Sequence, residues 1–425
     1  MNINEEFLQY TWKHGLFANK NLYTTNGEKI SVVHAGQWNS DSGPDFFNAS
    51  VKIGDTLWVG NVEVHINSSD WLKHKHQTDE AYNSVILHVV LNNDTQVKLP
   101  NGNELPTMLI IPNQEAQNSY ENLIQKESRP ACADQLQTID PIYIQATINT
   151  MLVNRIKQKT EAIQATMKMV KNSWNETFYR HLASNFGFKT NALPFEMLAR
   201  SLPLNVIAKH TKNLHQLEAL FFGQSGLLND QLLGDDYYLD LRNEYRYLAK
   251  KYQLKGIESH NWKFMRLRPA NFPTIRLAQL AALFPQSEAL FSRLTELSTP
   301  NEIRKIFKVK ASEYWNNHYR FNQTAPEKVK WIGESSLNNI LINTVVPFLY
   351  LYGEQQNKDA LKQRAFELLE SLPPEKNTII ENWKRFGIKS ENAYDTQALI
   401  ELRNNYCERK KCLHCQIGAK LINHK

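Results

Sequence analysis

The chain carries two acids and a histidine that can do chemistry together, in the stretch GPDFFNASVKIGDTLWVGNVEVH at positions 43–65. Asp45 opens one strand-like run and Glu63 lies in the next, and the Gly-Asp turn signal between the runs predicts a hairpin. Alternate residues of a strand share a face, so Glu63 and His65 point to the same side while the valines beside them face the core. We therefore expect both carboxylates and the imidazole at one site.

Two carboxylates that converge on one point suit Mg²⁺ or Mn²⁺, because these ions prefer hard oxygen ligands. Asp45 and Glu63 are the predicted ligands, and the backbone carbonyl of Val64 adds another. Such an ion polarises a phosphate and lowers the pKa of water, while His65 orients the nucleophile or stabilises developing charge. This combination predicts metal-assisted phosphodiester hydrolysis.

The elements that must position these residues lie between about Leu22 and Pro112, where the sequence is β-rich. Short runs of Val, Ile, Thr and aromatic residues alternate there with turn signals, as in KISVVHAG, ASVKIG, TLWVGNVEVHI, SVILHVVL and TQVKLP. Helical periodicity predicts a first helix in NEEFLQYTWKHGL and a second in SSDWLKHKHQTDEAYN, with Ser69 as the N-cap of the second. The predicted order is helix, three strands, helix, strand.

The two short motifs of this region resemble those of the PD-(D/E)XK nuclease superfamily. Pro-Asp at 44–45 resembles its first motif, and Glu-Val-His at 63–65 resembles the second, with histidine where lysine is usual. The element order is also similar to that of the family core. The resemblance implies a mixed sheet, a metal-dependent nuclease activity, and an accessory acid on the first helix, which is Glu6 or its neighbour Glu5.

The whole chain also looks like an uncharacterised bacterial family of unknown function. The short segments GPDF, VEVH, SDWLKH and ILHVV carry this second resemblance. It implies no activity.

His65 leaves several roles open because it replaces the usual lysine. Lysine stays cationic near neutral pH, whereas a histidine with an unperturbed pKa of ~6.5 is mostly neutral there. His65 is a general base, an additional metal ligand, or the mark of a core that has lost hydrolysis. In the last case the chain is a non-catalytic module that binds nucleic acid or a protein partner, with its helical part as a scaffold.

Further histidines follow His65 closely, namely His74, His76 and His88. A Zn²⁺ or Fe²⁺ site built from His65, one of the next two histidines and an acid is an alternative, because imidazole suits these metals. His74 and His76 are two residues apart and are expected on different sides of a helix, and no HExxH spacing is present. His88 is expected to face the interior beside Glu63. Otherwise these are ordinary core or surface histidines.

Three of the four cysteines cluster near the end of the chain, with the spacing C-x4-C-x2-C at Cys407, Cys412 and Cys415. Thiolates this close often bind a soft metal such as Zn²⁺. Plant-type iron–sulfur proteins use the same spacing with a fourth cysteine downstream. The candidates for a fourth ligand here are Cys132, His414 and His424. Some nucleases of the superfamily join distant segments through an iron–sulfur cluster, and this resemblance favours Cys132. The alternative is that the thiols are small buried hydrophobes.

The remaining sequence predicts a large helical domain. From about Pro141 strand signals nearly vanish, and apolar residues recur at helical spacing, as at Trp174 and Phe178. The predicted organisation is an α/β domain at 1–115, a connector at 116–140 and an all-α domain at 141–425 that contains the cysteine cluster. The fold class is thus an α/β domain with a mixed sheet followed by an all-α domain.

Charge and composition set the expected surroundings of the protein. A net charge of +6 over 425 residues permits a polyanion partner, so we expect nucleic acid, with DNA ahead of RNA. The chain starts MNINEEFLQYTW, which lacks the pattern of a signal peptide, and its most apolar window is shorter than a membrane span. We expect a cytoplasmic protein with no membrane partner.

Overall fold

The computed structural model describes residues 3–39, 42–128, 130–229, 234–286 and 290–423. The chain forms two compact units, of which the first, the sheet unit, comprises Met1–Ile148 with Leu402–Lys425. The second, the helical unit, is Asn149–Glu401, and the division falls inside helix α4 (Pro141–Met169). The C-terminal segment with its three cysteines therefore belongs to the sheet unit, whereas the sequence assigned it to a helical domain at 141–425.

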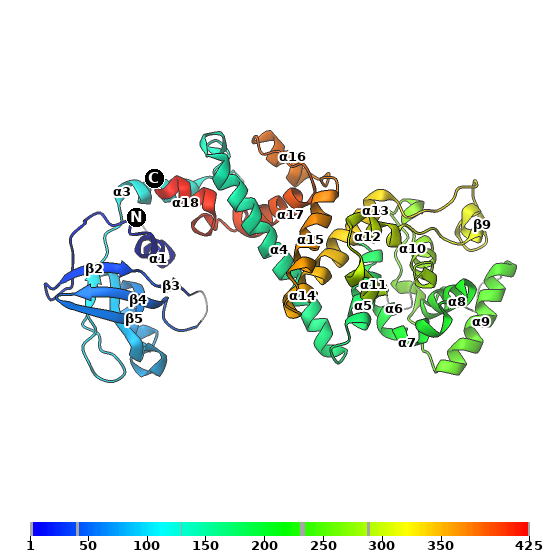
Figure 1. The fold of residues 1–425 in the computed structure, drawn as a ribbon, viewed down its shortest axis with the longest axis horizontal. Helices are drawn as coiled ribbons and strands as arrows, with labels where there is room; N and C mark the ends of the chain where they lie inside the picture. Colours follow the sequence, from blue (N-terminus) through cyan, green and yellow to red (C-terminus); the bar gives the residue numbers. More distant parts are fainter. Residues whose placement is uncertain (1–2, 40–41, 129, 230–233, 287–289, 424–425) are drawn as a thin grey trace. The chain divides into compact units, whose positions relative to one another are not determined.

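The described residues of the sheet unit form a mixed sheet of seven strands (Figure 1). A mixed sheet in this part of the chain was predicted from the sequence. Its strands run in the order β1, β2, β4, β5, β6, β7, and β3 pairs with β4. The pairs β1–β2, β2–β4, β3–β4 and β4–β5 are antiparallel. The pairs β5–β6 and β6–β7 are parallel. The strands are β1 (Leu22–Tyr23), β2 (Lys29–His34), β3 (Gln37–Trp38), β4 (Phe46–Ile53), β5 (Thr56–Asn67), β6 (Val85–Asn92) and β7 (Thr107–Leu109).

The two ends of this sheet also meet. Thr24 and Met108 form an isolated antiparallel bridge, and the amide of Thr25 donates to the carbonyl of Thr107 at 2.8 Å. The sheet therefore curls until β1 approaches β7.

Helix α1 (Glu5–His14) lies against β5 and closes one side of the core. The Asn4 side chain accepts a hydrogen bond from the amide of Phe7 and caps the helix, and Gly15 ends it in the left-handed conformation that favours glycine. The apolar side predicted from the sequence is buried, with Leu8 and Trp12 packed on valines of β4, β5 and β6. Burial of these side chains fixes how α1 faces the sheet.

The second predicted helix is much shorter than its sequence pattern suggested. Helix α2 covers Asp70–Lys73, and the 3-10 turns η1 (His76–Thr78) and η2 (Glu80–Ser84) follow it. Ser69 makes no capping hydrogen bond, because its hydroxyl donates to Asp94 instead, at 2.7 Å. The predicted strand TQVKLP is also absent from the described strands, with one isolated bridge in its place.

The sheet unit is completed by helices from both ends of its sequence. Helix α3 (Gln114–Gln125) and the turn η3 (Leu136–Thr138) occupy the segment predicted as a connector. Helix α18 (Gln416–Asn423), the red helix of Figure 1, packs beside α3. Apolar residues of α1, α3 and α18 share one core cluster, so the C-terminal segment is an integral part of this unit.

The helical unit contains a two-stranded hairpin in addition to its helices, with β8 (His318–Arg320) and β9 (Gln323–Thr324). The apolar stripe predicted on helix α5 (Trp174–Phe186) is buried at Phe178, Leu182 and Phe186. No described helix combines the length and hydropathy of a membrane span. Its further helices are α5 (Trp174–Phe186), α6 (Ala192–Ser201), α7 (Leu204–Ile207), α8 (Leu214–Gln224), α9 (Asp236–Tyr252), α10 (Pro273–Ala281), α11 (Leu290–Glu296), α12 (Pro300–Phe307), α13 (Glu334–Ile340), α14 (Val346–Gln355), α15 (Asp359–Ser371), α16 (Thr378–Arg385) and α17 (Ala393–Glu401).

A buried acid in the helical unit predicts a pH-dependent stability. Burial raises the pKa of Glu218 to about 7 from an ordinary value of 4.5, and Tyr237 donates to its carboxylate at 2.8 Å. The folded state therefore holds this proton more tightly than the unfolded state, so stability is lost as pH rises from about 4.5 through about 7. Relative to Glu218→Gln, the wild type should lose roughly 3 kcal/mol of unfolding free energy over that window. Urea unfolding of both proteins across the window measures this difference, and parallel curves would contradict it.

Candidate metal centre

The hairpin of β4 and β5 brings Asp45 and Glu63 together, as their spacing predicted. The amide of Asp45 donates to Oε2 of Glu63 at 3.0 Å, and Oδ2 of Asp45 accepts from the amide of Val64 at 3.0 Å. Gln9 of α1 donates to Oδ1 of Asp45 at 2.9 Å. A bulge in β4 next to Asp45, with Asn48 in the left-handed conformation, locally shifts the strand register. The backbone carbonyl of Val64 was a predicted metal ligand. The contact of Val64 with this site is instead made by its amide, which donates to Asp45.

The two acids repel one another in a place with little water. Glu63 is 4% exposed, and burial raises its pKa to about 8. Burial also raises the pKa of Asp45 to about 7, and the charge of Glu63 adds to the increase. A buried carboxylate and a partly buried one, both with elevated pKa values, favour a proton or a cation between them.

His65 and His88 lie on the same face of the sheet as Glu63. Glu63 pairs with His88 in the parallel register of β5 and β6, and both histidines are buried. Nδ1 of His65 lies 2.9 Å from Nε2 of His88. The interior position predicted for His88, beside Glu63, is confirmed.

His74 and His76 converge on His65, although the sequence placed them on different sides of a helix. The helix has already ended at Lys73, and Lys75 adopts a left-handed conformation with φ of 63°. That reversal brings both imidazoles to the same side. The ring of His76 stacks on Tyr82 with ring centroids 3.8 Å apart, whereas His74 is exposed to solvent. The site is thus rigid at His76 and open at His74.

Three imidazoles, of His65, His74 and His76, form a group of possible metal ligands, and the carboxylate of Glu63 lies beside two of them. Oε1 of Glu63 lies 3.3 Å from Nε2 of His76 and 3.5 Å from Nε2 of His65. Nε2 of His65 is in turn 3.2 Å from Nδ1 of His74. Bonds of ~2.0–2.1 Å to a tetrahedral ion place neighbouring ligand atoms roughly 3.3–3.4 Å apart. Among the described residues, the three histidines are the group of possible ligands whose atoms all lie within 4.8 Å of one another.

Burial favours the neutral form of His65, His76 and His88. Burial, together with neighbouring histidines, lowers the pKa of His65 to about 2 and that of His88 to about 3. Burial also lowers the pKa of His76, whose buried Nε2 has no hydrogen-bond partner. An unprotonated ring nitrogen next to a carboxylate oxygen brings two lone pairs together, and a cation relieves that repulsion.

The two glutamates at the start of α1 have different surroundings, and Glu6 is the one preferred on resemblance. Glu6 forms an ion pair with His414 at 2.7 Å, which lowers the pKa of Glu6. Glu5 instead has its pKa raised by burial and then by the charge of Asp45. Glu5 and Gln9 are one helical turn apart, so both face the site from α1. The sequence could have distinguished Glu5 from Glu6, because Glu5 lies one helical turn from Gln9.

The four cysteines also come together within the sheet unit. Cys132 lines one cavity with Cys407, Cys412 and Cys415. His414, another candidate for the fourth position, is engaged with Glu6 and stacks on Trp38. His424 lies outside the described residues.

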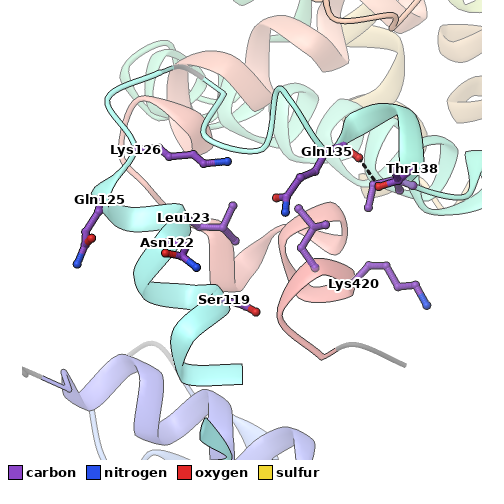
Figure 2. A pocket seen from close by; sticks show the side chains of 10 residues that line it. Ser119, Asn122, Leu123, Gln125, Lys126, Gln135, Thr138 and Lys420 are labelled. Atoms are coloured by element: carbon purple, nitrogen blue, oxygen red, sulfur yellow. Dashed lines mark hydrogen bonds between the residues drawn. The ribbon is translucent and has the colours of Figure 1, made fainter. Parts of the chain in front are cut away.

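A larger hollow of the sheet unit lies away from these groups (Figure 2). It has a volume of about 720 Å³ and is lined from α3, η3 and α18. Its lining consists of amides, hydroxyls, aliphatic side chains and the two lysines Lys126 and Lys420, without a carboxylate, an imidazole or a thiol. Its residues offer no metal ligands, and we assign the chemistry to the acids and histidines.

The chain belongs to a family described as protein of unknown function (DUF2851), which matches residues 5–378. Comparisons with curated proteins and with solved structures found no match.

Proposed function

We propose that this member of an uncharacterised family is a metal-dependent hydrolase that cleaves phosphodiester bonds in nucleic acid. The observation that supports it most is the convergence of three imidazoles, with the carboxylate of Glu63 beside those of His65 and His76. Such a donor set is buried on one side and open at His74, so a substrate can reach it. Structural ion sites are closed, whereas catalytic ones keep an open position.

The donor set favours a transition metal over Mg²⁺. Three imidazoles and one carboxylate suit Mn²⁺, Fe²⁺ or Zn²⁺, whereas Mg²⁺ prefers oxygen ligands alone. Of the two ions expected from the carboxylates, Mn²⁺ is compatible with this set. When bound, the ion would polarise a phosphate and lower the pKa of water.

The surrounding residues hold these ligands in place. For Nε2 of His65 to face the ion, Nδ1 must carry the proton and donate to Nε2 of His88. His88 is therefore a positioning residue that fixes the tautomer of His65. Asp45 holds Glu63 through its amide and adds negative charge, which strengthens the attraction for a cation.

Nucleic acid as the substrate rests on charge and on resemblance. The chain is mildly basic, and the residues at 44–45 and 63–65 resemble the nuclease motifs. The PD-(D/E)XK-like arrangement is part of this proposal, and it agrees with the mixed sheet and with the hairpin that joins Asp45 to Glu63. DNA is the first substrate to test.

The purified protein should cleave DNA or RNA in the presence of Mn²⁺ or Zn²⁺ and much more slowly with Mg²⁺ alone. The physical reason is the preference of imidazole for transition metals. Single-stranded, duplex and branched DNA and single-stranded RNA are incubated with each ion after treatment with a chelator, and products are measured on gels. His76→Ala should lower the activity with Mn²⁺ by at least roughly 100-fold, because it removes a ligand.

The control for nonspecific damage is Glu218→Gln, which changes a buried acid of the helical unit. It should cleave as the wild type does. Absence of metal-dependent cleavage on every substrate would favour the rival function, a non-catalytic module that binds nucleic acid or a protein partner. Cleavage that persists in His76→Ala would point to a contaminating nuclease.

A further inference from the structure

All four cysteines of the chain meet in one place, outside the centre described above. Cys132 follows α3, Cys407 ends the π-helix η10 (Leu402–Cys407), and Cys412 and Cys415 flank the turn η11 (Cys412–His414). Together with apolar residues they line a cavity of about 30 Å³. All four are free thiols. Structural cysteines that merely fill a core have no reason to gather from such distant parts of a sequence.

The thiols are buried close enough to influence one another. Burial raises the pKa of Cys132 to about 12, and the neighbouring Cys415 and Cys412 raise it further. Burial likewise raises the pKa of Cys407, followed by the influence of the other three cysteines. Four thiols held together with little access to water are poor sites for isolated negative charge, but a metal centre stabilises thiolates directly.

Hydrogen-bond donors are already aimed at one of these sulfurs. Cys415 accepts from the amides of Ile417 and Gly418 at the start of α18. Donors of this kind stabilise a thiolate and adjust the properties of the metal that it binds. A neutral thiol that only packs in a core does not require two such donors.

The spacing of the sulfurs distinguishes a cluster from a single ion. Tetrahedral zinc with bonds of ~2.3 Å holds its sulfurs roughly 3.8 Å apart. Among the described residues, the group of three or more possible ligands within 4.8 Å consists of histidines, so no three of these sulfurs are that close. In an iron–sulfur cluster the cysteines are shared among several irons, and their sulfurs are more widely spaced.

We propose that this chain binds an iron–sulfur cluster through Cys132, Cys407, Cys412 and Cys415. The C-x4-C-x2-C spacing matches plant-type ligation, with the fourth cysteine supplied from upstream. The cluster fastens the segment 402–425 to the rest of the sheet unit, to which α18 already packs through α3.

The test is the metal content of the full-length protein purified without oxygen. Iron, acid-labile sulfide and zinc are measured per chain, together with the visible absorption spectrum. We expect two or four irons with an equal amount of sulfide, as in the common clusters. Cys132→Ala should lower both by at least roughly tenfold, because it removes one ligand of the four. Sulfide is decisive because the histidine centre can also bind iron but holds no sulfide.

Two control variants separate the cluster from packing effects and from the histidine centre. Ala131→Ser changes a neighbour that lines the same cavity and should retain iron and sulfide. The double variant His65→Ala/His76→Ala should keep the sulfide and the iron that accompanies it, so this result does not depend on the proposed hydrolase. Should Cys132→Ala fail to fold, the iron and sulfide content of the wild type still shows whether the chain binds a cluster. Zinc without sulfide, no metal at all, or sulfide that persists in Cys132→Ala would overturn the proposal.

Discussion

Glu63→Gln is expected to lower metal-dependent cleavage roughly 100- to 1,000-fold while making the metal-free protein more stable. The loss of activity follows from removal of the carboxylate that lies beside the imidazoles of His65 and His76. The gain in stability follows because the amide replaces a buried acid that is costly to ionise. Glutamine keeps the oxygen that accepts from the amide of Asp45, and its nitrogen can donate to the unpartnered Nε2 of His76.

The pH dependence gives this prediction its sign. The pKa of Glu63 is about 8 when folded and 4.5 ordinarily, so the metal-free wild type loses stability as pH rises through that window. The variant lacks this loss, and at a pH just above about 8 it should be more stable by roughly 2–4 kcal/mol. Near the ordinary pKa of a glutamate the two proteins should differ little.

Thermal unfolding with chelator and with Mn²⁺ measures both effects. In chelator the variant should unfold at a temperature several degrees above that of the wild type. A difference of a few kcal/mol in unfolding free energy corresponds to such a shift for units of this size. Mn²⁺ should raise the unfolding temperature of the wild type alone, because a ligand that binds the folded state stabilises it. A variant that is less stable than the wild type at all pH values would show that Glu63 has a purely structural role.

The hairpin and its two acids could be predicted from the sequence because they depend on local signals. The Gly-Asp turn and the alternation in NVEVH fix which residues share a face, and the register of β4 and β5 follows from them. The position of His88 beside Glu63 was predictable for the same reason. Alternation in a strand is a short-range property, so one sequence is enough to show it.

The convergence of His74 and His76 could not be predicted because it depends on where helix α2 ends and on the left-handed conformation of Lys75. The hydroxyls of Ser68 and Ser69 both bond to the carboxylate of Asp94, which lies beyond the next strand. These bonds hold the start of α2 in place of an ordinary cap, and the helix then stops at Lys73. Local periodicity predicted a longer helix and carries no signal for the reversal at Lys75.

The C-terminal segment was misplaced for a related reason. Its association with the sheet unit rests on contacts between the two ends of the chain, such as the hydrogen bond of 2.9 Å between Tyr10 and Asn423. Lys410 also donates to the backbone carbonyl of Ile124. Only the convergence of cysteines hinted at such contacts, because a shared ligand requires distant residues to meet.

His65→Lys is expected to abolish activity at every pH, although lysine is the usual residue of the motif that His65 resembles. Burial among His88, His76 and His74 lowers the pKa of His65, so the site holds a neutral ring. An ammonium group has three donors and no lone pair, so it can neither bind the ion nor accept a proton. We expect a loss of at least roughly 100-fold and no extension of activity toward high pH.

The Mn²⁺-dependent cleavage assay at about pH 6 to 9 distinguishes the two roles of His65, since this range brackets an ordinary histidine pKa. His34→Lys is the matched control, because it places a lysine at an exposed histidine of β2 in the same sheet. The control should cleave normally, and the metal-induced rise in unfolding temperature should survive in it but not in His65→Lys. If His65 instead acts as a cation, His65→Lys will keep its activity and extend it to higher pH, and the neutral role that the surrounding imidazoles impose will be wrong.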